Sequence, residues 1–130
     1  SDPNYANRVS EYEFIQSTLD RISREHSTYY NPVDDWLPWD IYIINGAASG
    51  TDSASTDWAV NNYAKFVEYE ADWTRHKKAA GPIRNQVMLD TEKPIDLVVA
   101  FHGNKGTADM VRRARKEGIE VYEVKYTKTD

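Results

Sequence analysis

The apolar run IDLVVAF, at Ile95–Phe101, limits the possible folds more than any other part of the sequence. From Leu97 on, its residues are all apolar, without the alternation that a strand with one solvated face would show. Unbroken apolar runs of this length are typical of strands buried on both faces, as in parallel sheets that helices cover on both sides. The run therefore predicts a parallel strand in an α/β fold.

Helical and strand patterns alternate along the rest of the chain. A helix is predicted over residues 8–26, because apolar residues from Val9 to Ile22 recur at near-helical spacing with charges between them. Further strands are expected at Ile41–Ile44, 65–70 and Ile119–Val124, and further helices around Trp58, over 81–90 and over 106–117. This alternation predicts an α/β/α three-layer fold with a mostly parallel sheet, in a single domain over residues 1–130.

Composition excludes several classes of function. The sequence has no cysteine, so thiol catalysis, disulfides and thiolate metal sites are ruled out. Its three histidines lack metal-ligand spacing, and neither a metal nor a cofactor is expected. The formal net charge of −5 argues against a general nucleic-acid binder. No apolar run reaches the roughly 18 residues of a membrane span, so a soluble, cytoplasmic protein without membrane partners is expected.

Two glycine-containing turns follow predicted strands. NGAASGTD carries Gly46 and Gly50, and HGNKGTAD carries Gly103 and Gly106. The carboxyl ends of parallel strands open on one edge, so both turns are expected there. Glycine allows close approach of backbone to a ligand, and a helix start offers N–H groups to an anion. The turns suit phosphate, although tight strand-to-helix turns without a ligand would carry glycine too; neither turn has the Walker or the dinucleotide spacing.

A third candidate lies in KKAAGPIRNQVML. Gly81 and Pro82 predict a helix start there, which places Arg84 in the first turn, where the helix dipole mildly opposes its charge. Such a position is explained if the guanidinium binds a phosphate or carboxylate, for which arginine is well suited. The alternative is an ordinary surface arginine. Asn85 would bind a sugar hydroxyl or face solvent.

Several polar residues near these turns are ambiguous. Asp52 and Asp109 could bind ligand or only favour their helix starts. Trp73 could stack on a base, but packing as a buried tryptophan at the sheet edge is the favoured interpretation, and RRARK at Arg112–Lys116 is expected to be a solvated helix face. The candidate ligand-binding residues are Gly46, Ser49, Gly50, Thr51, Asp52, Arg84, Asn85, Gly103, Gly106 and Thr107.

Three blocks together resemble the YspA-type proteins of the Rossmann-like SLOG superfamily. They are GAASGTDSASTDWA, ADWTRHKKAAGPIRNQVML and DLVVAFHGNKGTADMVRRARKEGIEV, and the resemblance covers roughly Ile41 to Val124. It implies a Rossmann-like fold and a small ligand that is a nucleotide or is derived from one, such as ADP-ribose or a nucleoside monophosphate. The protein would then be a sensor or a sequestering module.

A more distant resemblance is to the LOG-type, lysine-decarboxylase-like phosphoribohydrolases. They cleave the N-glycosidic bond of nucleoside 5′-monophosphates, which implies an alternative function as an N-glycosidase with Arg84 and Asp109 as catalytic residues. Asp109 stands where these enzymes have a glutamate, and a histidine changes the start of the turn. Single-stranded DNA binding, as in DprA-like relatives, fits the negative charge poorly.

Both groups begin with a strand and a glycine turn before the first helix, and SDPNYANRV at the start of this sequence does not supply them. We therefore expect the first strand upstream of residue 1; the alternative is that another segment or subunit fills its place. The loop Tyr29–Trp39 carries four aromatic residues, and we expect it to pack on another element or on another copy of the chain in a homo-oligomer.

Overall fold

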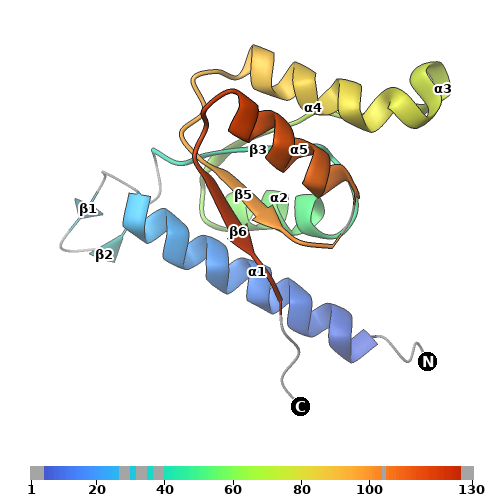
Figure 1. Ribbon diagram of the computed structural model, residues 1–130. Helices are drawn as coiled ribbons and strands as arrows, with labels where there is room; N and C mark the ends of the chain where they lie inside the picture. Colours follow the sequence, from blue (N-terminus) through green and yellow to red (C-terminus); the bar gives the residue numbers. More distant parts are fainter. Residues whose placement is uncertain (1–4, 27–29, 32–34, 37–39, 104, 127–130) are drawn as a thin grey trace. The chain divides into compact units, whose positions relative to one another are not determined.

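The computed structural model describes residues 5–26, 30–31, 35–36, 40–103 and 105–126. The chain forms two compact units, Ser1–Glu68 and Tyr69–Asp130, each of which combines helices with a small parallel sheet (Figure 1).

The first unit contains a parallel βαβ motif. Strand β3 (Tyr42–Asn45) leads through helix α2 (Thr51–Asn61) to strand β4 (Lys65–Glu68). The two strands pair in parallel, with Tyr42 opposite Lys65 and Asn45 opposite Glu68. At the end of α2, the Asn62 side chain donates to the Trp58 carbonyl at 2.8 Å and so satisfies one of the last helical carbonyl groups.

The long helix α1 (Tyr5–His26) packs on α2 with both apolar and polar side chains. Its core residues are Ile15, Leu19 and Ile22, each 7% exposed. Trp58 of α2, 1% exposed, donates its indole N–H to the Asp20 carboxylate of α1 at 2.8 Å. This bond fixes α1 against α2, because a buried tryptophan N–H needs an acceptor. A short antiparallel pair, β1 (Tyr30–Asn31) and β2 (Asp35–Trp36), follows α1.

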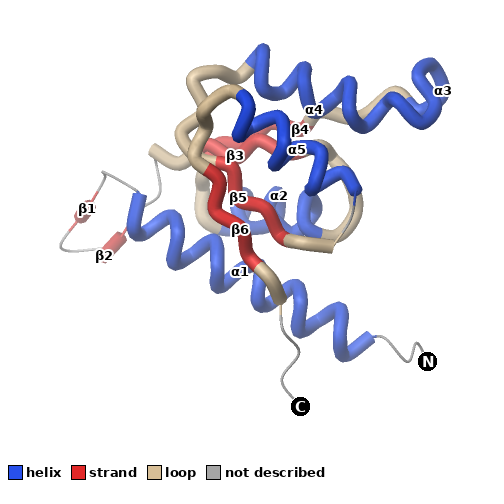
Figure 2. The backbone as a smooth tube through the Cα atoms, viewed as in Figure 1, coloured by secondary structure: helices blue, strands red, loops and turns tan. Residues whose placement is uncertain are grey.

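The second unit contains another parallel βαβ motif, β5 (Val98–Phe101), α5 (Lys105–Lys116) and β6 (Val121–Val124) (Figure 2). It is preceded by α3 (Trp73–His76), a 3-10 turn (Lys77–Ala79) and α4 (Ala80–Thr91), which packs on α5. Helix α5 ends with basic residues, which suit the negative end of its dipole. Gly118 follows at φ 75°, a left-handed conformation that glycine adopts without strain.

The observed elements confirm most of the predicted ones, with shifted bounds. The described strands form two parallel pairs, β3–β4 and β5–β6, and one antiparallel pair, β1–β2. A single parallel sheet of Ile41–Ile44, Ile95–Phe101 and Ile119–Val124 stays a prediction. Strand β5 is shorter than its apolar run, and only Ala100 in it is fully buried. The predicted packing of the aromatic loop falls outside what the structure describes. Tyr29 and Trp39 lie outside the described residues, and for Tyr30 and Trp36 only the backbone is described.

Replacing Trp58 should destabilise the fold strongly. Trp58→Ala is expected to lower the free energy of unfolding by about 3–5 kcal/mol, because it removes a buried aromatic side chain and the bond to Asp20. Val60→Ala, on the same helix at a 57% exposed position, should change it by less than about 0.5 kcal/mol. Urea denaturation of the two variants checks this, and equal losses would contradict it.

Candidate functional site

The turn after β3 has an unusual backbone. Ala47 has φ 58° and Gly50 has φ 80° with ψ −118°, so two residues with positive φ lie between β3 and the start of α2 at Thr51. Alanine rarely adopts a left-handed conformation, and such positions cost of order 1–3 kcal/mol unless their surroundings enforce them. Ala47 therefore needs local support.

The side chain of Asn45 supplies this support. Asn45 is the last residue of β3 and is 5% exposed. Its Oδ1 accepts from the Ala47 N–H at 2.9 Å, and its Nδ2 donates to the Asp52 carbonyl at 3.0 Å and to Ser55 Oγ at 2.9 Å. One buried amide thus ties the strand end, the left-handed turn and the first turn of α2 together.

The tip of this turn is open. Ala48, Ser49 and Gly50 are exposed, and no side chain caps the start of α2. The Ala48 N–H donates to the carboxylate of Asp52 at 3.1 Å. The turn can therefore present backbone N–H groups to an anion, and Asp52 already shows that an anionic oxygen fits there.

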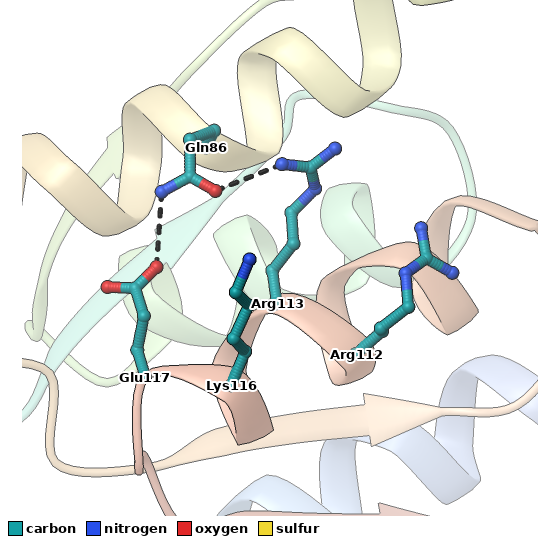
Figure 3. A pocket seen from close by; sticks show the side chains of 5 residues that line it. All are labelled: Gln86, Arg112, Arg113, Lys116 and Glu117. Atoms are coloured by element: carbon teal, nitrogen blue, oxygen red, sulfur yellow. Dashed lines mark hydrogen bonds between the residues drawn. The ribbon is translucent and has the colours of Figure 1, made fainter.

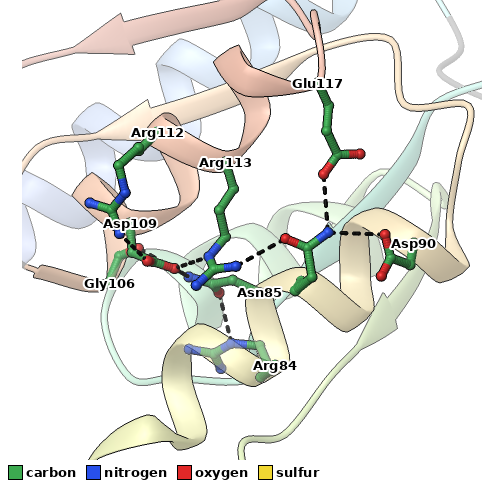
Figure 4. Close-up of polar contacts among 9 residues, drawn as sticks. Arg84, Asn85, Asp90, Gly106, Asp109, Arg112, Arg113 and Glu117 are labelled. Atoms are coloured by element: carbon green, nitrogen blue, oxygen red, sulfur yellow. Dashed lines mark hydrogen bonds and ion pairs between the residues drawn. The ribbon is translucent and has the colours of Figure 1, made fainter.

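The second unit has a cluster of polar side chains around Asp109 of α5 (Figure 4). Asp109 is 7% exposed, and both its carboxylate oxygens have partners. Oδ1 accepts from Arg112 Nη2 at 2.5 Å, and Oδ2 accepts from Arg113 Nε at 2.8 Å and from Asn85 Nδ2 at 3.0 Å. Because Asn85 also donates to the Gly106 carbonyl at 3.2 Å, it joins α4 to the first turn of α5.

These contacts set the ionisation of Asp109. Burial raises the pKa of its carboxyl group, but the hydrogen bonds from Arg113 and Asn85 and the charges of Arg113 and Arg112 outweigh burial. The pKa of Asp109 is therefore below its ordinary value, and the group is a carboxylate at neutral pH.

Arg84 lies further into its helix than the sequence predicted. Helix α4 begins at Ala80, so Arg84 is its fifth residue and lies beyond the first turn. The helix dipole therefore opposes the charge of Arg84 less than the sequence predicted, and this reason to expect an anion beside it is weaker. Its Nε donates to Asn85 Oδ1 at 2.9 Å and its Nη1 to the Tyr69 carbonyl at 3.4 Å. In these bonds Arg84 is linked to Asp109 through the Asn85 side chain. Arg112 and Arg113 contact the Asp109 carboxylate directly.

The structure places the predicted ligand residues in two groups. Gly46, Ser49, Gly50, Thr51 and Asp52 lie in the first unit, and Arg84, Asn85, Gly103, Gly106 and Thr107 lie in the second. Gly46 and Asn85 are buried, whereas Gly103 and Gly106 are exposed. A shared edge for the two turns stays a prediction.

Sequence reasoning missed three polar residues. Asn45 was not among the candidates, although it directly follows the apolar residues of a strand. The expectation of a solvated RRARK face was wrong for Arg113, which is only 29% exposed in its side chain and pairs with Asp109. The signal was the spacing of three and four residues from Asp109 to Arg112 and Arg113, which places these side chains side by side on a helix.

Two hollows border this cluster. One, of about 270 Å³, lies between α4 and α5, where Gln86 accepts from Arg113 and donates to Glu117 (Figure 3). The other, of about 390 Å³, is lined in part by His102 and Glu123, whose Nε2 and Oε1 atoms are 3.0 Å apart. Within the described residues no group of His, Asp and Glu could hold a metal ion.

A known family matches the first unit and the start of the second. The sequence model of the YspA, cpYpsA-related SLOG family matches residues 6–76, more than half of the chain. The chain belongs to this SLOG family. The match includes the turn at Gly46–Gly50 and Trp73, and it ends before Arg84.

One relative spans most of the chain. The Gene 61 protein of Mycobacterium phage D29 is 28% identical over 112 residues, which cover 80% of this chain and 90% of that protein. No solved structure matches the chain significantly. Among the described residues, no helix has the length and apolar character that crossing a membrane requires.

The low pKa of Asp109 leads to a pH-dependent prediction. Asp109→Asn should lower the free energy of unfolding by about 1.5–3 kcal/mol at pH 7, the range for hydrogen bonds to a charged group. The carboxylate contributes fully above the unfolded pKa of about 3.9 and loses its contribution as the pH falls through the lower folded pKa. The difference between the two proteins should therefore shrink below about pH 4.

Denaturation at a series of pH values measures this difference. Asp90→Asn is the control, since exposed Asp90 accepts from Gln86 at 3.0 Å; it should change stability by less than about 0.5 kcal/mol. A difference for Asp109→Asn that stays constant down to about pH 2 would contradict the assignment.

Proposed function

We propose that this SLOG-family chain binds a nucleotide or a nucleotide-derived ligand, such as ADP-ribose or a nucleoside monophosphate, as a sensor or sequestering module. Family membership supports a nucleotide-related function. The observation that carries the proposal is the turn at Gly46–Gly50, with its left-handed backbone, exposed tip and uncapped helix start. The proposal includes a Rossmann-like three-layer fold, supported by the two parallel βαβ motifs.

In this proposal the turn binds a phosphate group of the ligand. Backbone N–H groups at the start of a helix favour an anion by direct hydrogen bonds and by the helix dipole. Gly50 has open space where a Cβ would lie, so a phosphate oxygen could approach its backbone. The phosphate would compete with Asp52 for the Ala48 N–H, and the buried Asn45 would hold the turn in shape meanwhile.

In the second unit, Arg84, Gly103, Gly106 and Thr107 are likewise proposed as ligand-binding residues. Asn85 is proposed to position Arg84, because its Oδ1 accepts from the Arg84 Nε. A homo-oligomer and a cytoplasmic location remain expectations.

The described contacts favour binding over N-glycosidic hydrolysis. In the hydrolase alternative, Asp109 would orient the ribose or stabilise oxocarbenium character, and its lowered pKa keeps it ionised, as that role needs. Both its oxygens, however, are occupied by Arg112, Arg113 and Asn85. We therefore propose Asp109 as a positioning residue, and its catalytic role stays a prediction.

The glycine turn can be tested with a matched pair of variants. Gly50→Ala forces a side chain onto φ 80°, ψ −118°, and should cost of order 1–3 kcal/mol of stability and weaken binding of ADP-ribose or AMP by about 1.5–3 kcal/mol. Gly118→Ala, at φ 75° after α5, should cost about 1–2 kcal/mol of stability and leave affinity unchanged.

Calorimetric titration and thermal unfolding of both variants separate the two effects. Equal affinity losses in Gly50→Ala and Gly118→Ala would mean that general destabilisation weakens binding. The phosphate assignment of the turn would then be wrong.

Arg84→Ala should weaken binding of the same ligands by about 1.5–3 kcal/mol, because a hydrogen-bonded charge pair with the phosphate is lost. It should also cost about 1 kcal/mol of stability, since the contacts to Asn85 and the Tyr69 carbonyl go with it. Arg75→Ala, which removes an exposed arginine of α3, is the control and should leave titrated affinity unchanged. Unchanged affinity in Arg84→Ala would leave that residue with a structural role alone.

A further inference from the structure

Trp73 is unusually exposed for its size. It begins α3 and is 58% exposed, whereas Trp58 in the core of the first unit is 1% exposed. The favoured expectation of a buried Trp73 was therefore wrong. Tryptophan contributes more apolar surface than most residues, so leaving its ring in water forgoes burial that the fold could have used.

The backbone and one contact hold this ring in place. The Asp72 side chain accepts from the Arg75 N–H at 3.1 Å, which caps the short helix that carries Trp73. The ring atom Cη2 lies 3.4 Å from the point where a Cβ on Gly81 would be. The edge of the ring thus rests against the start of α4 at a residue without a side chain, and the rest of the indole stays accessible.

A cation lies beside the ring. Arg84 Nη2 lies 3.8 Å from the same Cβ position on Gly81 that lies 3.4 Å from Trp73 Cη2. Arg84 Nη2 and Trp73 Cη2 are therefore no further apart than the sum of these two distances. Arg84 donates to the Asn85 side-chain oxygen and to the Tyr69 carbonyl, which hold its guanidinium in place. All these residues belong to the second unit. An accessible aromatic face and a fixed guanidinium therefore lie next to each other.

We propose that Trp73 is the stacking platform for the base of a mononucleotide whose phosphate pairs with Arg84. This inference rests on the proposed function and adds the residue that selects an aromatic base. A mononucleotide joins a planar base to an anionic phosphate through one ribose, which matches the indole and the guanidinium in kind. Stacking on an aromatic side chain tolerates any base, so Trp73 distinguishes ligands with a base from ligands without one.

The test compares AMP with ribose 5-phosphate, which shares the sugar and phosphate and lacks the base. The wild-type chain should bind AMP more tightly than ribose 5-phosphate. Trp73→Ala should weaken AMP binding at least about fivefold, the lower end of the range for stacking of one base. It should change the affinity for ribose 5-phosphate less than about twofold, and Trp73→Phe should retain most of the AMP affinity because the ring remains.

Fluorescence gives a second, direct measurement. AMP should quench part of the tryptophan emission of the wild-type chain, which has four tryptophans, and the quenching should disappear in Trp73→Ala although three remain. Tyr63→Ala is the control, because Tyr63 is an aromatic residue of the other unit, 84% exposed. It should leave both the affinities and the quenching unchanged.

The outcomes separate this inference from the proposed function. If the wild-type chain binds AMP and Trp73→Ala leaves the ratio of AMP to ribose 5-phosphate affinity unchanged, the stacking role is overturned and the proposed function stands. If AMP, ADP-ribose and ribose 5-phosphate all fail to bind, both are overturned. A loss in Trp73→Ala confined to oligonucleotide binding or to self-association of the chain would also overturn it.

Discussion

A polar side chain that is buried must find hydrogen-bond partners, and each unit of this protein is organised around one such group. In the first unit it is the amide of Asn45, which is 5% exposed and bonds the turn on one side and α2 on the other. In the second it is the carboxylate of Asp109, 7% exposed, which joins α5 to α4 through Asn85. Both groups lie near the carboxyl end of a parallel strand, where α/β proteins place their ligands. The interactions that complete the fold are therefore the same ones that shape the candidate binding surfaces.

This arrangement explains why a strained turn can persist at Ala47. A left-handed alanine would relax if the chain around it were free, but Asn45 bonds the Ala47 N–H, the Asp52 carbonyl and Ser55 at once. Moving the turn would leave a buried amide unsatisfied, which costs about as much as the strain. The turn is thus held ready before any ligand arrives, and binding there need not include the free energy of ordering the loop.

The sequence predicted the parallel βαβ elements well, because the apolar runs and glycine turns are local signals. It predicted the start of α4 poorly. Pro82 suggested a helix start immediately before it, whereas the helix begins at Ala80 and continues from a 3-10 turn. Proline fits anywhere in the first turn, since the N–H groups there have no helical partner. One residue pattern therefore permits several starts, and the role of Arg84 depends on which start is used. The exposure of Trp73 was likewise beyond local patterns, because it depends on the contact of its ring with Gly81, eight residues further along.

The arginines of the second unit divide into two kinds by their partners. Arg112 and Arg113 pair with a buried carboxylate, so their charge is balanced within the fold. If Arg113 moved toward a ligand, the buried Asp109 carboxylate would lose a charged partner, which would destabilise the fold. Arg84 donates to an amide oxygen and to a backbone carbonyl, which orient its guanidinium. A ligand phosphate at Arg113 would compete with its ion pair to Asp109. Among the arginines of the second unit, we therefore propose Arg84 on α4 as a phosphate contact, although α5 carries more positive charge.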